Sequence, residues 1–317
     1  MTDKNNLIVY CEFDEGKVAD VSLELLTKGR ELAKKLGVKL EALVIGDKLD
    51  GIEDQIFPYG ADVVYKVEDK RLFPYISNPH AAVLIQLFKE IEPQICLMGA
   101  TCIGRDLGPR VSSCLHSGLT ADCTSLEIGP HKDPKTGKEY TDLLYQIRPA
   151  FGGNIVATIV NPDCRPQMAT VREGVMKKEI LDPNHKGEVI DLDPNKYVSD
   201  ADFAVEIIDR HIEKSKINIK NAPIIVAGGY GVGSKENFQL LHELADTLGA
   251  EVGASRAAVD AGFAEHARLI ATTGRTVRRT LSIACASSLT LPHIPRITAR
   301  FYITSITYEP PVNTNLR

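Results

Sequence analysis

The sequence contains no tryptophan, no Cys-x-x-Cys pair and no excess of positive charge. Its 37 lysines and arginines are outnumbered by 42 aspartates and glutamates, which gives a formal net charge of −5. Because binding to a phosphate backbone needs clustered cations, this balance argues against nucleic-acid binding as the main role. No apolar run reaches the length of about 18 residues that a membrane-spanning helix needs, so no such helix is predicted.

The seven cysteines are scattered along the chain without the spacing of a metal site. An odd count with no paired spacings disfavours a disulfide framework, a zinc site and an iron–sulfur cluster. Most of these cysteines are expected to be small buried thiols. The first residues, MTDKNN, do not resemble a signal peptide. The sequence therefore predicts a reducing, cytoplasmic location and no bound metal.

The first half of the chain alternates between strand-like and helix-like segments. Buried strands are predicted at 6–13, 39–46, 62–67 and 94–99, and helices at 21–36 and 79–91. Gly37 is expected to end the first of these helices, because glycine tolerates the left-handed backbone that often follows one. Strands that alternate with helices imply right-handed crossovers and a mainly parallel sheet.

From residue 118 to about residue 190 the pattern changes to short strands separated by polar turns. These strands are predicted at 120–128, 141–149, 154–160 and 167–171, with a hairpin loop at 131–138. A polar segment, 191–200, comes next, and we expect a domain boundary shortly after it. The sequence thus predicts an α/β protein of two domains, 1–203 and 204–317, each built on a mainly parallel sheet.

The second domain begins with a strand that runs into a glycine-rich turn. The strand is predicted at 223–227 (PIIVA) and the turn at 228–234, followed by a helix with one apolar face. Glycines in this position let backbone N–H groups approach a phosphate. The turn is neither a strict Rossmann fingerprint nor a Walker sequence, because Ser234 stands where the third glycine or the lysine should be. A tight turn with close helix–strand packing explains the glycines equally well.

The segment 253–262 (GASRAAVDAG) is a second candidate for ligand binding. A planar, always charged guanidinium such as that of Arg256 is suited to a bound ring or phosphate. From spacing alone, an exposed arginine at a helix start is the simpler interpretation. His80, His116 and His242 have no matched partner in the sequence and are interpreted as solvated or capping residues. No catalytic acid–base residue is therefore predicted.

Longer stretches of the sequence resemble the alpha subunit of electron-transfer flavoproteins. The resemblance is carried by GGYGVGSKENFQLLHELADTLGAEVGASRAAVDAGF at 228–263, by 99–128 and by QIRPAFGGNIVATIV at 146–160. It implies an N-terminal domain similar to adenine-nucleotide hydrolases, which packs on a beta subunit. It also implies a C-terminal FAD-binding domain of the Rossmann-like, doubly wound type, which relays single electrons and does not transfer hydride.

The resemblance can be carried over residue by residue to a set of cofactor-binding positions. These are Gly231, Ser255, Arg256, Thr273, Gly274, Ser288 and His293. Ser255 and Arg256 belong to the loop that meets the flavin in the family. A positive charge there is expected to stabilise the reduced flavin and raise its reduction potential.

The remaining candidate positions follow in the C-terminal part of the chain. Thr273 and Gly274 keep the last two positions of a Gln-Thr-Gly turn, whose threonine lies near the flavin N5 in the family. Ser288 and His293 are the two ends of a stretch that runs along the cofactor. The resemblance therefore implies that these four residues line the flavin.

The sequence also departs from the family pattern. Tyr230 stands where the family has an arginine that contacts the cofactor, and Thr272 replaces the glutamine of the Gln-Thr-Gly turn. Residues 289–292 replace the middle of the serine-to-histidine stretch, and the family's final aspartate, which meets the adenosine end of FAD, has no counterpart. Because the upstream motif is largely intact, we expect an unreliable or truncated C-terminal region here, and not a loss of FAD binding.

Residues 161–176 (NPDCRPQMATVREGVM) resemble the form found in anaerobic fermenters, including electron-bifurcating members. In that form NADH reduces a second FAD held mainly by the beta subunit. One electron passes to ferredoxin or flavodoxin, and the other passes through the FAD of the alpha subunit to an acyl-CoA dehydrogenase of fatty-acid metabolism.

Three other functions remain open at this point. One is a non-bifurcating flavoprotein that takes electrons from acyl-CoA dehydrogenases, with AMP in the beta subunit. Another is a redox-inactive nucleotide-binding scaffold. The third, a stand-alone nicotinamide-dependent dehydrogenase, is disfavoured by the imperfect glycine fingerprint.

The placement of Arg256 beside the flavin can be tested by removing its charge. We expect Arg256→Ala to lower the reduction potential of FAD, because a positive charge that stabilises the reduced cofactor is lost. Potentiometric titration of the alpha–beta complex measures this shift. A potential equal to that of the wild type would exclude Arg256 from the flavin site.

Overall fold

The computed structural model describes residues 4–134, 136–150, 156–210, 219, 222–270, 281–286 and 303–306. The chain divides into two compact units, of which the first takes the described residues up to 210 and the second those from 219 onward. Each unit is an α/β structure with its own parallel sheet, as the sequence predicted. The predicted boundary between residues 203 and 204 stays a prediction.

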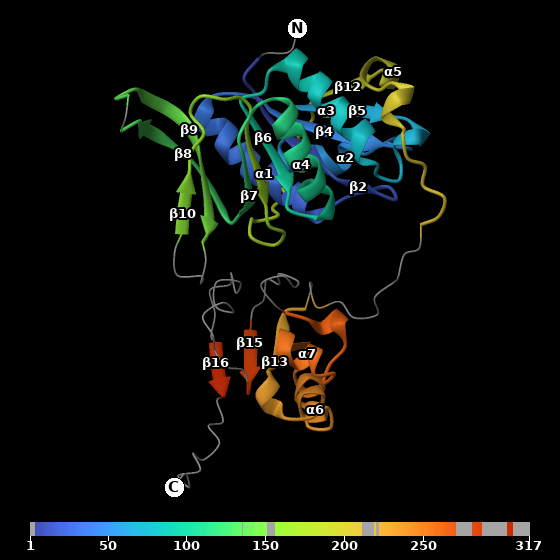
Figure 1. Cartoon of the computed structure of the whole chain (residues 1–317), viewed down its shortest axis with the longest axis vertical. Helices are drawn as coiled ribbons and strands as arrows, with labels where there is room; N and C mark the ends of the chain where they lie inside the picture. The colour runs from blue at the N-terminus through green and yellow to red at the C-terminus, as the bar shows by residue number, and fades with distance from the viewer. Residues whose placement is uncertain are drawn as a thin grey trace. The chain divides into compact units, whose positions relative to one another are not determined.

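Seven strands form the large sheet of the first unit (Figure 1). They are β1 (Leu7–Cys11), β4 (Leu40–Gly46), β5 (Val63–Glu68), β6 (Ile95–Gly99), β7 (Leu119–Cys123), β11 (Gln167–Val171) and β12 (Glu188–Leu192). Their order is β12-β5-β4-β1-β6-β11-β7, and every neighbouring pair is parallel. The chain moves outward from β1 to β4 and β5 and then returns to the other side of β1 as β6. The strand order therefore reverses between β1 and β6.

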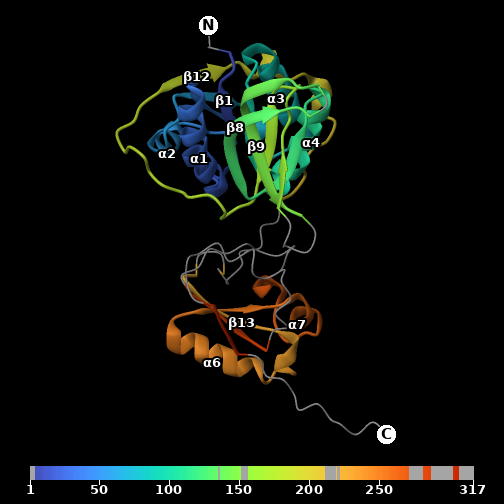
Figure 2. The ribbon, with the colours of Figure 1, turned by 90° about the vertical axis from the view of Figure 1, so that its left-hand side faces the viewer.

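Helices cover both faces of this sheet (Figure 2). On one face lies α1 (Asp20–Leu36), and on the other lie α3 (Ser77–Ile91) and α4 (Cys102–Cys114). Shorter helical segments are α2 (Glu53–Ile56), η1 (Phe57–Tyr59), η2 (Lys70–Leu72), α5 (Pro194–Tyr197) and η3 (Asp200–Asp202). Gly37 follows α1 with a φ of 69°, which confirms its predicted role as the residue that ends this helix.

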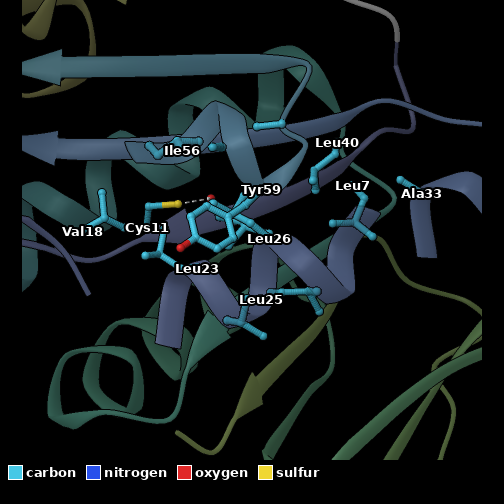
Figure 3. Close-up of a cluster of buried hydrophobic side chains, with 14 of the residues drawn as sticks. Leu7, Cys11, Val18, Leu23, Leu25, Leu26, Ala33, Leu40, Ile56 and Tyr59 are labelled. Atoms are coloured by element: carbon cyan, nitrogen blue, oxygen red, sulfur yellow. Dashed lines mark hydrogen bonds between the residues drawn. The ribbon is translucent and has the colours of Figure 1, made fainter. Parts of the chain in front are cut away.

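The core of the first unit lies in two layers, one on each side of the sheet. Side chains of a strand point alternately to its two faces, so Leu7 and Val9 pack beneath α1, whereas Ile8 and Tyr10 pack beneath α3 and α4. Figure 3 shows the layer beneath α1, in which leucines of the helix meet those of the strands. Gly29 lets α1 approach closely, because a Cβ at this position would lie 2.8 Å from the Cδ1 of Leu40.

An antiparallel sheet and a short hairpin complete the first unit. The sheet has the order β10-β9-β8 and consists of β8 (Ser125–Lys132), β9 (Glu139–Pro149) and β10 (Val156–Ile159). The hairpin is formed by β2 (Phe13–Asp14) and β3 (Lys17–Val18). The strand predicted at 120–128 is in fact two strands, since β7 belongs to the parallel sheet and β8 to the antiparallel one.

Four parallel strands form the sheet of the second unit. They are β13 (Ile224–Gly228), β14 (Glu251–Ala254), β15 (Leu281–Cys285) and β16 (Ile303–Ile306), in the order β14-β13-β15-β16. The helical segments are η5 (Tyr230–Val232), α6 (Phe238–Leu248), α7 (Arg256–Asp260) and η6 (His266–Arg268). The apolar face of α6 buries Phe238, Leu241 and Ala245 against the sheet. Here the strand order reverses between β13 and β15.

No helix in the part of the chain that the structure describes has the length and apolar character to cross a membrane.

The packing beneath α1 predicts the cost of shortening a core side chain. Leu26 is fully buried, so Leu26→Ala is expected to destabilise the first unit by about 2–5 kcal/mol through the cavity that it leaves. Urea unfolding of the full chain measures this change. Ile180 is 58% exposed, and Ile180→Ala is the control, expected to cost less than about 0.5 kcal/mol. Equal losses for the two variants would contradict the assignment of this core.

Candidate functional site

The candidate site lies at the carboxyl edge of the second sheet, where β13, labelled in Figure 1, and its neighbour β14 end. The glycine-rich turn follows β13, and Ser255 and Arg256 follow β14. The backbone N–H of Ser255 donates to the carbonyl of Gly228 at 2.9 Å and so joins the two loops. Ligands of doubly wound sheets bind at the carboxyl ends of the strands, and the order of this sheet reverses at the neighbouring pair, β13 and β15.

Three of the predicted site residues lie at this edge, and four cannot be placed. Gly231, Ser255 and Arg256 belong to the two joined loops. Thr273, Gly274, Ser288 and His293 lie outside the described residues, as do Thr272 and residues 289–292. The expectations that rest on these positions stay predictions.

The backbone N–H groups of the glycine-rich turn donate hydrogen bonds to carbonyls of the protein itself. The N–H groups of Gly229 and Gly231 donate to the carbonyls of Cys285 and Ala286, at 2.9 Å and 3.1 Å. The N–H groups of Val232 and Gly233 donate back to residues within the turn. The turn therefore connects β13 to the end of β15 and does not hold these four amides free for a phosphate. This geometry favours the tight-turn interpretation.

Gly231 is explained by the close approach of two chain segments. A Cβ at Gly231 would lie 2.8 Å from the carbonyl oxygen of Ala286, too close for any other residue without a shift. Ala286 itself has a φ of 47°, a left-handed conformation that is uncommon for alanine. Strained backbone of this kind is concentrated at functional sites. Binding of the cofactor by Gly231 itself stays a prediction.

Ser255 and Arg256 begin the short helix α7. The Oγ of Ser255 accepts from the backbone N–H of Ala258 and caps the helix. The Nε of Arg256 donates to both carboxylate oxygens of Asp260, at 2.8 Å and 2.9 Å. Within the described part of the chain, no group accepts from the two terminal nitrogens of Arg256. An exposed cation, whose terminal nitrogens have no acceptor among the described residues, therefore lies at this edge.

An aromatic surface lies at the same sheet edge, with Tyr230 in the loop that follows β13. Tyr230 is 61% exposed, and its ring stacks on Phe263 with 5.7 Å between centroids and 18° between planes. Phe263 in turn packs on the buried Phe238 at 6.2 Å. The tyrosine could be read from the sequence, but its stacking partner could not. A flat aromatic surface and a guanidinium in two joined loops suit a cofactor that carries a planar ring and negative charge, as FAD does.

The corresponding edge of the first sheet is filled by a carboxyl group that sequence reasoning missed. Glu12 follows β1, Thr101 follows β6, and the Oγ1 of Thr101 donates to the Oε1 of Glu12 at 2.7 Å. The absence of a side chain at Gly99 provides space for this carboxyl group, because a Cβ there would lie 3.0 Å from the same oxygen. The available signal was an acidic residue near the end of an otherwise apolar run, NLIVYCEF at 6–13.

Burial gives Glu12 an unusual titration. Desolvation raises its pKa from 4.5 to about 7, the hydrogen bond from Thr101 opposes this, and the nearby charge of Glu173 adds to it. The chain's own carboxyl group therefore occupies the edge at which the strand order of the first sheet reverses.

His80 corrects one interpretation of the sequence. It is buried and not solvated, with Nδ1 3.1 Å from the hydroxyl of Tyr10 and Nε2 2.9 Å from the carbonyl of Leu72. Burial lowers the pKa of His80 to about 4, so it is neutral at physiological pH. Among the described residues, no group of three or more histidine, cysteine, aspartate or glutamate side chains could hold a metal ion.

Comparisons with known proteins match nearly the whole chain. The model of the electron transfer flavoprotein domain matches residues 7–197, and that of the electron transfer flavoprotein FAD-binding domain matches residues 218–297. The electron transfer flavoprotein subunit alpha of Thermoanaerobacterium thermosaccharolyticum is 41% identical over 311 residues, which cover 98% of this chain and 91% of the relative.

Two further relatives carry different names. Protein FixB of Clostridium saccharobutylicum is 45% identical over 298 residues, which cover 93% of this chain and 84% of the relative. Subunit LctC of the lactate dehydrogenase (NAD(+),ferredoxin) of Acetobacterium woodii is 36% identical over 306 residues, covering 96% of this chain and 70% of its own.

The buried carboxyl group predicts a pH-dependent stability of the first unit. Because the pKa of Glu12 is higher in the folded than in the unfolded chain, its contribution is lost as pH rises from about 4.5 to about 7. Glu12→Gln should therefore gain stability relative to the wild type over this range, by up to about 3 kcal/mol at about 1.4 kcal/mol per pKa unit.

Urea unfolding at a series of pH values measures this difference. The same substitution at the exposed Glu127 is the control for replacing a carboxyl by an amide. A difference between Glu12→Gln and the wild type that stays constant with pH would show that Glu12 is not buried as described.

Proposed function

Since this chain belongs to the electron-transfer flavoprotein alpha-subunit family, we propose that it relays single electrons through an FAD held at the carboxyl edge of its second unit. Members of this family bind FAD and pair with a beta subunit, and this chain does the same. The observation that carries the proposed placement is that Arg256 and Tyr230 lie in two loops at one sheet edge inside the matched FAD-binding domain. Bound FAD supplies the redox chemistry, and the protein supplies binding and electrostatics.

Each residue of the edge has a proposed task. Arg256 provides a positive charge beside the flavin, and Ser255 fixes the start of the helix that carries it. Tyr230 covers the neighbouring surface, and Gly231 lets the turn lie against the end of β15. Thr273, Gly274, Ser288 and His293 are proposed to complete the flavin site. The proposed division of labour is that residues 1–203 pack on the beta subunit and residues 204–317 bind FAD.

We further infer that the complex is of the electron-bifurcating type. The similarity to LctC supports this inference, since the name of that relative joins NAD(+) to ferredoxin in one enzyme. NADH would then reduce a second FAD held mainly by the beta subunit. One electron would pass to ferredoxin or flavodoxin and one through this chain to an acyl-CoA dehydrogenase, in the cytoplasm and in fatty-acid metabolism. The non-bifurcating alternative has AMP in the beta subunit.

A redox-inactive scaffold is the second candidate. It is favoured by the glycine-rich turn, in which four backbone amides are already engaged within the protein. The replacement of the family's arginine by Tyr230 points in the same direction.

The flavin content of the alpha–beta complex distinguishes these functions. The complex is purified, its nucleotides are released by denaturation and separated into FAD and AMP, and NADH is added to the intact protein under exclusion of oxygen. The proposal expects two FAD per heterodimer and bleaching of the flavin absorbance by NADH. One FAD with AMP and no response to NADH would establish the non-bifurcating type. A complex without flavin would contradict the proposed relay and leave the scaffold.

A further inference from the structure

The ion pair between Arg256 and Asp260 is exposed at the site edge. Their side chains are 60% and 55% exposed, at the first and the last position of α7. Exposed ion pairs contribute little to the stability of a fold, because solvent screens them and both side chains lose freedom. The stability of the second unit therefore does not explain why this pair is present.

The orientation of the pair is also unfavourable for the helix. A helix prefers acidic residues near its N-terminus and basic residues near its C-terminus. Pairs four residues apart follow the same preference, with the acidic residue first. In α7 the cation comes first and the anion last, which reverses the preferred order. Helix propagation does not explain the pair either, so its role lies outside α7.

A second ion pair of the same unit provides the contrast. The Nη1 of Arg268 lies 3.3 Å from Glu251 and also donates to the backbone carbonyl of Val252 at 3.0 Å. Only 17% of the Arg268 side chain is exposed, so this pair fastens the segment after α7 to β14. It is a structural pair, and it serves as a matched control.

Hydrogen bonds at both ends hold the backbone of α7. The position of the Arg256 guanidinium therefore depends on the rotation of its side chain. Ser255 caps its start, and after its end the N–H of Phe263 donates to the carbonyl of Ala258 at 2.9 Å. The ring of Phe263 lies against Tyr230 on one side and Phe238 on the other. Asp260 accepts from the Nε of Arg256, and among the described residues no group accepts from the two terminal nitrogens.

We propose that Asp260 is the positioning residue and counter-ion of Arg256. It orients the guanidinium through Nε, and its negative charge limits how strongly Arg256 stabilises the reduced flavin. The inference rests on the proposed function, because it requires FAD beside Arg256. Asp260 acts through the arginine and does not itself touch the cofactor.

The test is a double-mutant cycle on the FAD-containing alpha–beta complex, with the reduction potential of FAD as the readout. Asp260→Asn keeps an oxygen that can accept from Nε but removes the negative charge. We expect Asp260→Asn to shift the reduction potential of FAD to a more positive value. Asp260→Glu keeps the charge and is expected to keep the wild-type potential. In an Arg256→Ala background, Asp260→Asn is expected to cause a much smaller shift, because the exposed carboxylate is then no longer held by the guanidinium and solvent screens its charge. Glu251→Gln, at the structural pair, should leave the potential unchanged.

The outcomes separate the inference from the function on which it rests. If Arg256→Ala shifts the potential but Asp260→Asn does not, the inference is overturned and the relay stands. Equal shifts by Asp260→Asn with and without Arg256 would also overturn it, since Asp260 would then act as an independent charge. A wild-type complex without FAD, or an unchanged potential in Arg256→Ala, would overturn the placement of the flavin and the inference together.

Discussion

The parallel pairing of β13 with both β14 and β15 is the constraint on which the second unit depends. Because all three strands run in one direction, their following loops leave from the same edge of the sheet. Hydrogen bonds from Gly229 and Gly231 to the end of β15, and from Ser255 to the end of β13, then join these loops. A cation and an aromatic ring therefore lie at one edge because of the strand order and not because of their distance in the sequence.

The two sheets use the same edge in opposite ways. In the first unit Glu12 and Thr101 fill the position where the strand order reverses, with a carboxyl group whose pKa of about 7 reflects its burial. In the second unit Arg256 and Tyr230 are both exposed, in two loops at this edge. An anionic cofactor is repelled by a buried carboxylate and attracted by an exposed guanidinium. The two units of one chain thus differ at this edge, which holds a buried carboxyl group in the first and an exposed cation in the second.

Much of the fold could be predicted from the sequence, because buried strands, amphipathic helices and Gly37 leave local patterns. Contacts between distant residues could not. The filling of the first edge by Glu12 depends on strand order and on the glycine at position 99, and the burial of His80 depends on its partner Tyr10. At the candidate site the residue types were predicted from a family resemblance, whereas the pairing of Arg256 with Asp260 and the stacking of Tyr230 on Phe263 required coordinates.

The central claim is that FAD lies at the carboxyl edge of the second sheet. Hydrogen–deuterium exchange of the alpha–beta complex, with FAD removed and then restored, tests it most directly. The structure predicts that FAD slows exchange in peptides that cover residues 228–234 and 254–263, and leaves peptides around Glu12 and Thr101 unchanged. Protection confined to the edge of the first sheet, or absent from both segments of the second unit, would contradict the claim.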